Sequence, residues 1–249
     1  MTVDENTGRY ELRWIGYDGK GKVVKYQRPD TLDAAVEASA VKRSNSYVYR
    51  YVLRNLTSSP NSVLEFLVQT FSRDIGSDRV PGNDDIYIGH MSTHIPNFSN
   101  GVWRRWGFLT ATSKVPPGES REVQIVSKSQ PGVVGCYAGA AEPTLKGVWE
   151  HMPSELEAAM PGYDELASCV KIGPDERLAR MSKDEKVTYL LDNLSKFIEA
   201  GWMAGDTPKM YEAILRRNDL HGAYEQATRD LEKEYITTEV FSIIEGLIN

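Results

Sequence analysis

Apolar and polar residues alternate in parts of the first two thirds of the chain, as they do in β-strands with one buried face. In residues 47–54, three tyrosines and a leucine occupy every second position, with valines and arginines between them. This period of two predicts a half-buried strand. Further apolar runs of strand length lie at 10–15, 23–26, 63–69, 102–112, 121–127 and 133–138.

Clusters of Gly, Pro, Asn and Ser separate these runs, and such clusters favour turns. Residues 17–21, Tyr-Asp-Gly-Lys-Gly, have the composition of a hairpin turn. About seven short strands joined by turns, with no helical crossovers between them, predict an antiparallel β-sandwich and argue against a parallel α/β sheet.

The hydrophobic period changes to that of a helix from about residue 174. Ser182 and Glu185 have the spacing of a capping box, which predicts a helix start. Gly201 is expected to end this helix, and Asp206 followed by Pro208 to begin the next. The apolar residues of the first helix recur every three or four positions, at Val187, Leu190, Leu191, Leu194, Phe197 and Ile198.

Two more helices are expected over 220–234 and 237–248, which together make a small bundle. The fold class predicted for the chain is therefore α+β. We expect a β-sandwich domain over residues 1–173 and a helical domain over residues 174–249.

Composition and charge narrow the classes of partner. The chain has 249 residues, of which 41% are hydrophobic and 26% charged, as in a globular protein. Its net charge is −6, and residues 173–249 contribute most of it, with 15 acidic and 10 basic side chains. This balance argues against a nucleic-acid partner. No apolar stretch reaches the roughly 18–20 residues of a membrane-spanning helix.

The first residues leave the compartment open. The start, Met1 to Asn6, has no basic segment followed by an apolar one, so it does not form a signal peptide. Two interpretations remain. The protein is cytoplasmic, or the sequence begins after a removed signal peptide and the protein is exported.

Several fragments, taken in order, carry a family resemblance. They are the Tyr-rich run and its Asn-Leu-Thr-Ser-Ser turn (47–59), the Trp-containing run (102–108), Pro-Gly-Glu-Ser before an alternating run (117–127), Pro-Gly-Val-Val leading to Tyr-Ala-Gly (131–139), and Pro-Ser-Glu-Leu-Glu (153–157) leading to Ile-Gly-Pro (172–174). Together they resemble the Ig-like domains of exported bacterial proteins of unassigned function, over about residues 45–175. Such domains often stand before a small helical module.

The resemblance implies a non-enzymatic binding or assembly module of the bacterial envelope or exterior, with a protein or glycan partner. It supplies no catalytic residues. Cys136 and Cys169 are either two free thiols that pack as small apolar groups or one disulfide, and the disulfide would suit an exported protein. A zinc site is disfavoured because neither cysteine has a second ligand at CxxC spacing.

Two segments could hold a metal ion. His90 and His94 have the i, i+4 spacing of a helical zinc pair, although their neighbours favour a loop or strand and no HExxH glutamate is present. The nearby loop carries oxygen ligands that calcium accepts, without the spacing of an EF-hand, at Asp74, Asp78, Asn83, Asp84 and Asp85. The alternative to a metal-dependent hydrolase built on these residues is a set of solvated surface side chains. We expect no cofactor, and calcium is the alternative that the acidic loop keeps open.

The run Trp103-Arg104-Arg105-Trp106 is the most unusual short segment. Exposed tryptophans beside arginines could stack on sugars or bind an anionic group, whereas buried tryptophans with solvated arginines would be structural. No GxSxG, P-loop or GxGxxG motif is present in the sequence. Three hypotheses follow, namely the exported binding module, the metal-dependent hydrolase and a cytoplasmic protein-interaction protein.

Overall fold

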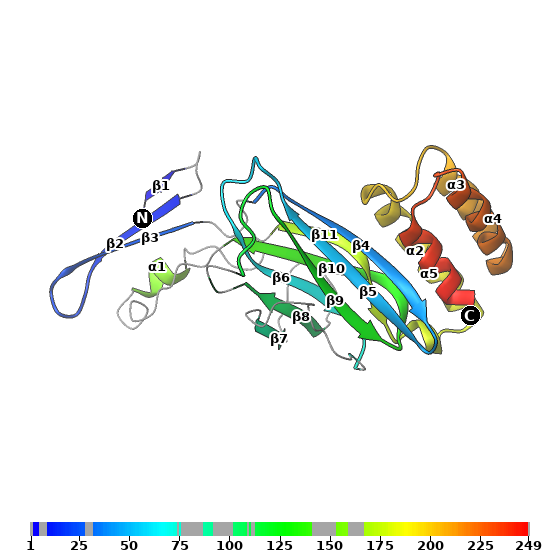
Figure 1. The fold of residues 1–249 in the computed structure, drawn as a ribbon, viewed down its shortest axis with the longest axis horizontal. Helices are drawn as coiled ribbons and strands as arrows, with labels where there is room; N and C mark the ends of the chain where they lie inside the picture. Colours follow the sequence, from blue (N-terminus) through cyan, green and yellow to red (C-terminus); the bar gives the residue numbers. More distant parts are fainter. Residues whose placement is uncertain are drawn as a thin grey trace.

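The computed structural model describes residues 2–4, 9–27, 32–73, 75, 87–91, 102–108, 110, 113–140, 153–158 and 167–248 (Figure 1). Its strands form three sheets, in which all neighbouring strands are antiparallel. One sheet has the order β4-β5-β9, comprising Ala34–Arg43, Ser46–Asn55 and Ser120–Ser127. A second has the order β11-β10-β6-β8-β7, comprising Ala167–Asp175, Gln130–Ala140, Val63–Thr70, Val102–Gly107 and Tyr87–Met91.

The third sheet contains β1 (Thr2–Asp4), β2 (Arg9–Ile15) and β3 (Gly21–Gln27). Its strands pair with one another, and none of the described sandwich strands pairs with them. The β2–β3 hairpin extends away from the sandwich, on the left of Figure 1. Its turn carries Tyr17, whose side chain is 90% exposed. The two runs before residue 30 are therefore strands, as expected, but they form a sheet of their own.

The β4-β5-β9 and β11-β10-β6-β8-β7 sheets pack face to face around one apolar core. Strand β5 shows the alternation that the sequence predicted, with its three tyrosines and Leu53 buried and both arginines exposed. Tyr51 contacts the opposite sheet, with ring centroids 5.9 Å from Phe66 and 6.3 Å from Trp106. Burial of such aromatic groups is the main favourable contribution to folding of a sandwich.

Each buried tyrosine of β5 also needs a partner for its hydroxyl group. The Tyr51 hydroxyl donates to the backbone carbonyl of Ile172 in β11 at 2.9 Å. The Tyr49 hydroxyl donates to the carbonyl of Ser129 at 2.6 Å. These bonds allow large side chains to fill the core without leaving a polar atom unsatisfied, and the first bond joins the two sheets.

The helices begin and end close to the predicted positions. Helix α2 (Lys183–Glu199) starts with the predicted capping box, in which Glu185 N–H donates to Ser182 Oγ and Ser182 N–H donates to the Glu185 carboxylate. Helices α3 (Thr207–Leu215), α4 (Leu220–Glu232) and α5 (Thr238–Ile248) complete the helical unit, while the short α1 (Ser154–Ala158) lies apart from it (Figure 1). Asp206 precedes α3 as expected, but its side chain makes no capping bond and pairs with Lys209 instead.

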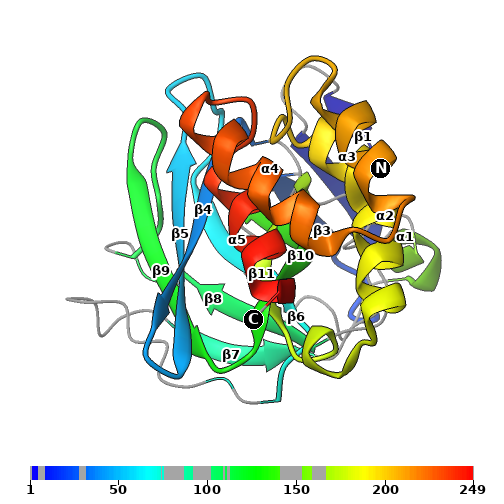
Figure 2. The ribbon, with the colours of Figure 1, turned by 90° about the vertical axis from the view of Figure 1, so that its right-hand side faces the viewer.

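The helical unit is packed onto the sandwich through α5 and α2, as Figure 2 shows from the helical side. A Cβ atom at Gly246 of α5 would lie 3.1 Å from Pro131 of β10, so glycine permits this close approach. Tyr189 of α2 accepts a hydrogen bond from the backbone N–H of Val133 at 2.8 Å. Buried residues of both sheets and of α2–α5 form one continuous cluster.

The α+β class, an antiparallel sandwich followed by a small helical bundle, is thus confirmed. Strands β4 and β11 of the sandwich were not predicted, and for the segment that forms β7 the sequence left loop or strand open. Strand β11 ends at Asp175 and leads through a short 3-10 turn, Leu178–Arg180, into α2. The division into two domains at residue 173 stays a prediction.

We expect the substitution Tyr51→Phe to destabilise the protein by about 1–3 kcal/mol, because it leaves the buried Ile172 carbonyl without its donor. Urea unfolding followed by circular dichroism measures the change. Tyr17→Phe is the matched control, since the Tyr17 side chain is 90% exposed and water can replace a contact made by its hydroxyl. Equal stabilities of the two variants would contradict a structural role for the Tyr51 hydroxyl.

Candidate functional site

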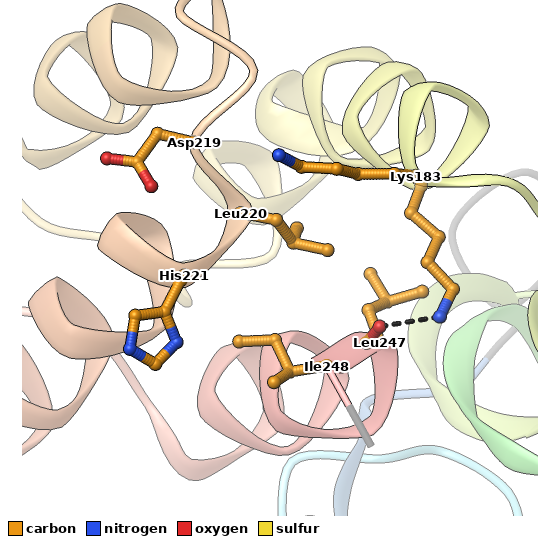
Figure 3. Close-up of a pocket in the computed structure, with 7 residues that line it drawn as sticks. Lys183, Asp219, Leu220, His221, Leu247 and Ile248 are labelled. Atoms are coloured by element: carbon orange, nitrogen blue, oxygen red, sulfur yellow. Dashed lines mark hydrogen bonds between the residues drawn. The ribbon is translucent and has the colours of Figure 1, made fainter.

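Among the described residues, three hollows that border the helical unit differ in the partners of their charged groups. One of about 320 Å³ lies where α2 and α4 begin and α5 ends (Figure 3). Lys186 donates to the carbonyl of Leu247 at 2.7 Å, which is the dashed bond in Figure 3. Asp219 accepts from the N–H of Gly222 at the start of α4, and His221 lies 3.4 Å from Glu225. Lys186 thus binds a carbonyl at the end of α5, Asp219 caps the start of α4, and His221 lies beside Glu225 on the surface of α4.

A second hollow of about 260 Å³ lies beside the turn between β11 and α2. Its charged groups are paired with one another or with the backbone. Arg177 donates to both carboxylate oxygens of Asp175, at 2.8 and 2.6 Å, and its guanidinium lies 3.4 Å from the centre of the Phe71 ring. Glu185 belongs to the capping box of α2. This arrangement fixes the path of the chain from the sandwich into the helices.

The third hollow, of about 540 Å³, lies between the start of α3 and the end of α4. We call it the α3–α4 hollow. Its volume is within the range of small-ligand sites, roughly 300–1,000 Å³. Its lining combines apolar surface with a few polar groups, from Ala204, Gly205, Asp206, Thr207, Met210, Gln226, Asp230, Lys233 and Tyr235.

Asp230 distinguishes the α3–α4 hollow from the other two. The residue is only 2% exposed, and its Oδ1 accepts a hydrogen bond from Gln226 at 2.8 Å. Its Oδ2 is buried, and no cation pairs with the carboxylate within the described part of the chain. Asp175 is buried as deeply, yet both of its oxygens are satisfied by Arg177. A buried carboxylate without a cation beside it lowers the stability of the fold, so its presence needs a physical explanation.

The surroundings of Asp230 add to this cost. It lies in the last turn of α4, where the helix dipole disfavours a negative charge. The Tyr211 hydroxyl lies beside the carboxylate, and both this hydroxyl and Asp230 Oδ2 are buried. Burial, then the charge of Asp230 and a hydrogen bond to it, raise the pKa of Tyr211 well above its ordinary value. A cation bound in the hollow would relieve both the burial and the dipole penalties.

Sequence reasoning did not single out Asp230, because it treated the acidic residues after 173 as solvated helix faces. The signal was available in the helical spacing. Leu220, Ala223 and Ala227 define the buried face of α4, and Asp230 continues the same three- and four-residue spacing. A charged residue on the apolar face of an amphipathic helix departs from the usual pattern.

The Trp103–Trp106 run does not present an aromatic surface. Trp103 is 1% exposed and Trp106 is 0% exposed. Trp106 stacks against Phe66 in the core, and Trp103 lies edge-on to Tyr137 at 5.2 Å. Arg105 pairs with Glu65 at 2.8 Å, and burial lowers the pKa of Arg104. Since stacking on a sugar needs an accessible ring face, we propose no glycan site at these residues.

The predicted metal ligands fall largely outside the described residues. Asp74, Asp78, Asp84, Asp85 and His94 lie there, and His90 belongs to β7 with its side chain undescribed. Within the described ranges, no group of three His, Cys, Asp or Glu side chains could hold a metal ion. No described helix is long and apolar enough to span a membrane.

The two cysteines, which have 32 residues between them in the sequence, lie side by side in the fold. Cys136 of β10 and Cys169 of β11 are directly opposite each other in the antiparallel register, and both are free thiols. Sequence reasoning listed them as a candidate pair without being able to place Cys169 on a strand.

Comparisons with known proteins found no family and two solved structures of low similarity. No protein-family model and no curated protein matches this sequence. An uncharacterized protein from Nocardia farcinica with an immunoglobulin-like fold matches at 10% identity and a TM-score of 0.30, covering 53% of this chain and 94% of that one. A protein described as the unique CBM of Ruminiclostridium thermocellum matches at 14% identity and a TM-score of 0.27, covering 38% and 70%. Neither likeness indicates what this chain binds.

The start of α2, which borders two of the hollows, yields a pH-dependent prediction. The Ser182 N–H and then its hydroxyl hold the pKa of Glu185 below its ordinary value. The capping contribution of this carboxylate is therefore complete above the ordinary pKa and is lost as the pH falls through the lowered one. NMR titration of the side-chain carboxyl should show this lowered pKa. Ser182→Ala should raise it partway, because the backbone donor remains, and an ordinary pKa in the unmodified chain would contradict the capping box.

Proposed function

We propose that this chain is a non-catalytic binding module whose α3–α4 hollow takes a protonated amine on an apolar stem. That chemistry belongs to a lysine side chain presented by a protein partner. The observation that carries the proposal is the buried Asp230 carboxylate, which borders the hollow and has no cation paired with it in the described part of the chain. An ammonium group is the complement that this carboxylate lacks, and charge-assisted hydrogen bonds of this kind are stronger than neutral ones.

The walls of the hollow suit the rest of such a ligand. Met210 and Tyr235 provide apolar surface, and the Tyr235 side chain is 51% exposed, so a ligand can reach it from solvent. A lysine stem of four methylene groups packs on apolar surface while its charged end makes the polar contact. Binding to Asp230 and to these walls would thus use both parts of the side chain.

Net charge supports the same class of partner. Residues 173–249 carry five more acidic than basic side chains, which favours approach of a basic surface at low ionic strength. Lys233 also borders the hollow, and its ammonium opposes the binding of an amine there. Removal of the Lys233 charge should therefore strengthen the binding of an amine. If the hollow bound its ligand through apolar contacts alone, this removal would leave the affinity unchanged.

The test is an NMR titration with Nα-acetyl-lysine methylamide, compared with the norleucine analogue that has the stem without the charge. We expect the lysine probe to shift the signals of Met210 and of residues 204–207, and the norleucine probe to bind more weakly. Asp230→Asn should weaken the lysine probe by about 1.5–3 kcal/mol, roughly ten- to a hundredfold. Lys233→Met should strengthen it.

Asp192→Asn is the matched control, because it makes the same change in net charge at an exposed position of α2. Unfolding of the free variants separates recognition from structure. If Asp230 serves binding, Asp230→Asn should leave stability unchanged or raise it, since a buried charge without a cation beside it is removed. Equal binding of the two probes, or unchanged lysine binding by Asp230→Asn, would refute the proposal.

We propose in addition that the module acts outside the cytoplasm. The support is the ordered set of fragments that resembles exported bacterial domains. Immunoblotting of cytoplasmic and exported fractions from cells that express the natural gene tests this. Recovery of the protein from the cytoplasmic fraction alone would favour the intracellular interaction hypothesis.

A further inference from the structure

The cysteines of β10 and β11 occupy a position where two thiols can be joined without rearranging the fold. Cys136 and Cys169 are register partners, with paired residues on both sides of them from Gln130↔Asp175 to Ala138↔Ala167. Directly opposite residues of antiparallel strands have Cα atoms about 4.5–5.5 Å apart, which lies within the about 4.4–6.8 Å that a disulfide spans. The ladder itself therefore holds the pair at bonding range.

The two thiols differ in access and in chemistry. Cys136 is fully buried in the core cluster, whereas Cys169 is partly exposed. The thiols interact directly, and this contact, helped by Lys171, lowers the pKa of Cys169, while burial raises the pKa of Cys136. A partly exposed thiol of lowered pKa is the one that reacts with an oxidant first, because the thiolate is the nucleophile.

We propose that Cys136 and Cys169 form a reversible disulfide that fastens the edge strand β11 to β10. The Cys169 thiolate attacks a sulfur of a low-molecular-weight disulfide such as oxidised glutathione, forming a mixed disulfide and expelling one glutathione thiolate. Cys136 then loses its proton and attacks the Cys169 sulfur, which forms the intramolecular bond and expels the second thiolate. The protein loses two electrons and two protons, and the small disulfide becomes two thiols.

Reversibility follows from the access of Cys169. Because this residue is partly exposed, a small thiol can attack its sulfur in the disulfide and expel Cys136, which is the reverse of the closing step.

The position of β11 determines what the disulfide would stabilise. It is the terminal strand of its sheet, and it runs directly into the helical unit through Asp175 and Arg177. Edge elements open locally more easily than central ones. A covalent link at Cys169 would hold the strand to which the helices are attached.

The experiment uses the full chain, first reduced and then equilibrated in glutathione buffers of graded composition without denaturant. Alkylation and mass spectrometry count the free thiols. We expect the species with two free thiols to convert to the species with none, with a loss of two mass units, and to return when the buffer is made reducing. The oxidised form should melt at a higher temperature than the reduced form.

The variant Cys136→Ala should accumulate one glutathione on Cys169, because its second thiol is absent. The double variant Cys136→Ala/Cys169→Ala should melt at the same temperature in oxidising and reducing buffers. Persistence of both free thiols under oxidising conditions would overturn the proposal. So would a glutathione adduct that remains on Cys169 in the unmodified chain, or an internal disulfide that native conditions cannot reduce.

Discussion

The contact of Tyr51 with the opposite sheet is the constraint on which the architecture depends. Its ring lies against Phe66 and Trp106, and its hydroxyl donates to a carbonyl of β11. One side chain thus fills the centre of the sandwich and links the short sheet to three strands of the long one. Gly173 of β11 leaves room for it, since a Cβ atom there would lie 3.2 Å from the Tyr51 hydroxyl. The position of β11 and of everything attached to it follows from this contact.

Two buried carboxylates of the helical unit and its entry turn differ in their partners. Asp175 and Arg177 form a satisfied buried pair at the turn where β11 gives way to the helices. Asp230, at the far end of α4, is buried without such a partner. The same chain therefore contains one buried carboxylate that is paired with a cation and one that has no cation beside it in the described part of the chain. This contrast is the reason why the proposed recognition site lies in the helices.

Much of this architecture could be predicted from local patterns. The alternation in residues 47–54 and the capping box at Ser182 each encode their element within a few residues. Strand β4 escaped notice because it is rich in alanine, which is uncommon in strands. Strand β11 contains Gly173 and Pro174, which resemble a turn, and proline is tolerated there because the strand lies at a sheet edge. The α3–α4 hollow and the register of the cysteines arise from packing between distant segments, which spacing along one segment does not reveal.

The bond between Val133 and Tyr189 limits how this protein can be recombined. A backbone donor of the sandwich is satisfied by a hydroxyl of the first long helix, and glycine at position 246 gives α5 a close approach to Pro131 of β10. Replacement of the helices by those of another protein would leave the Val133 amide without its acceptor and tighten the contact at Pro131. Transplanted helices that keep the matching tyrosine and glycine preserve both contacts.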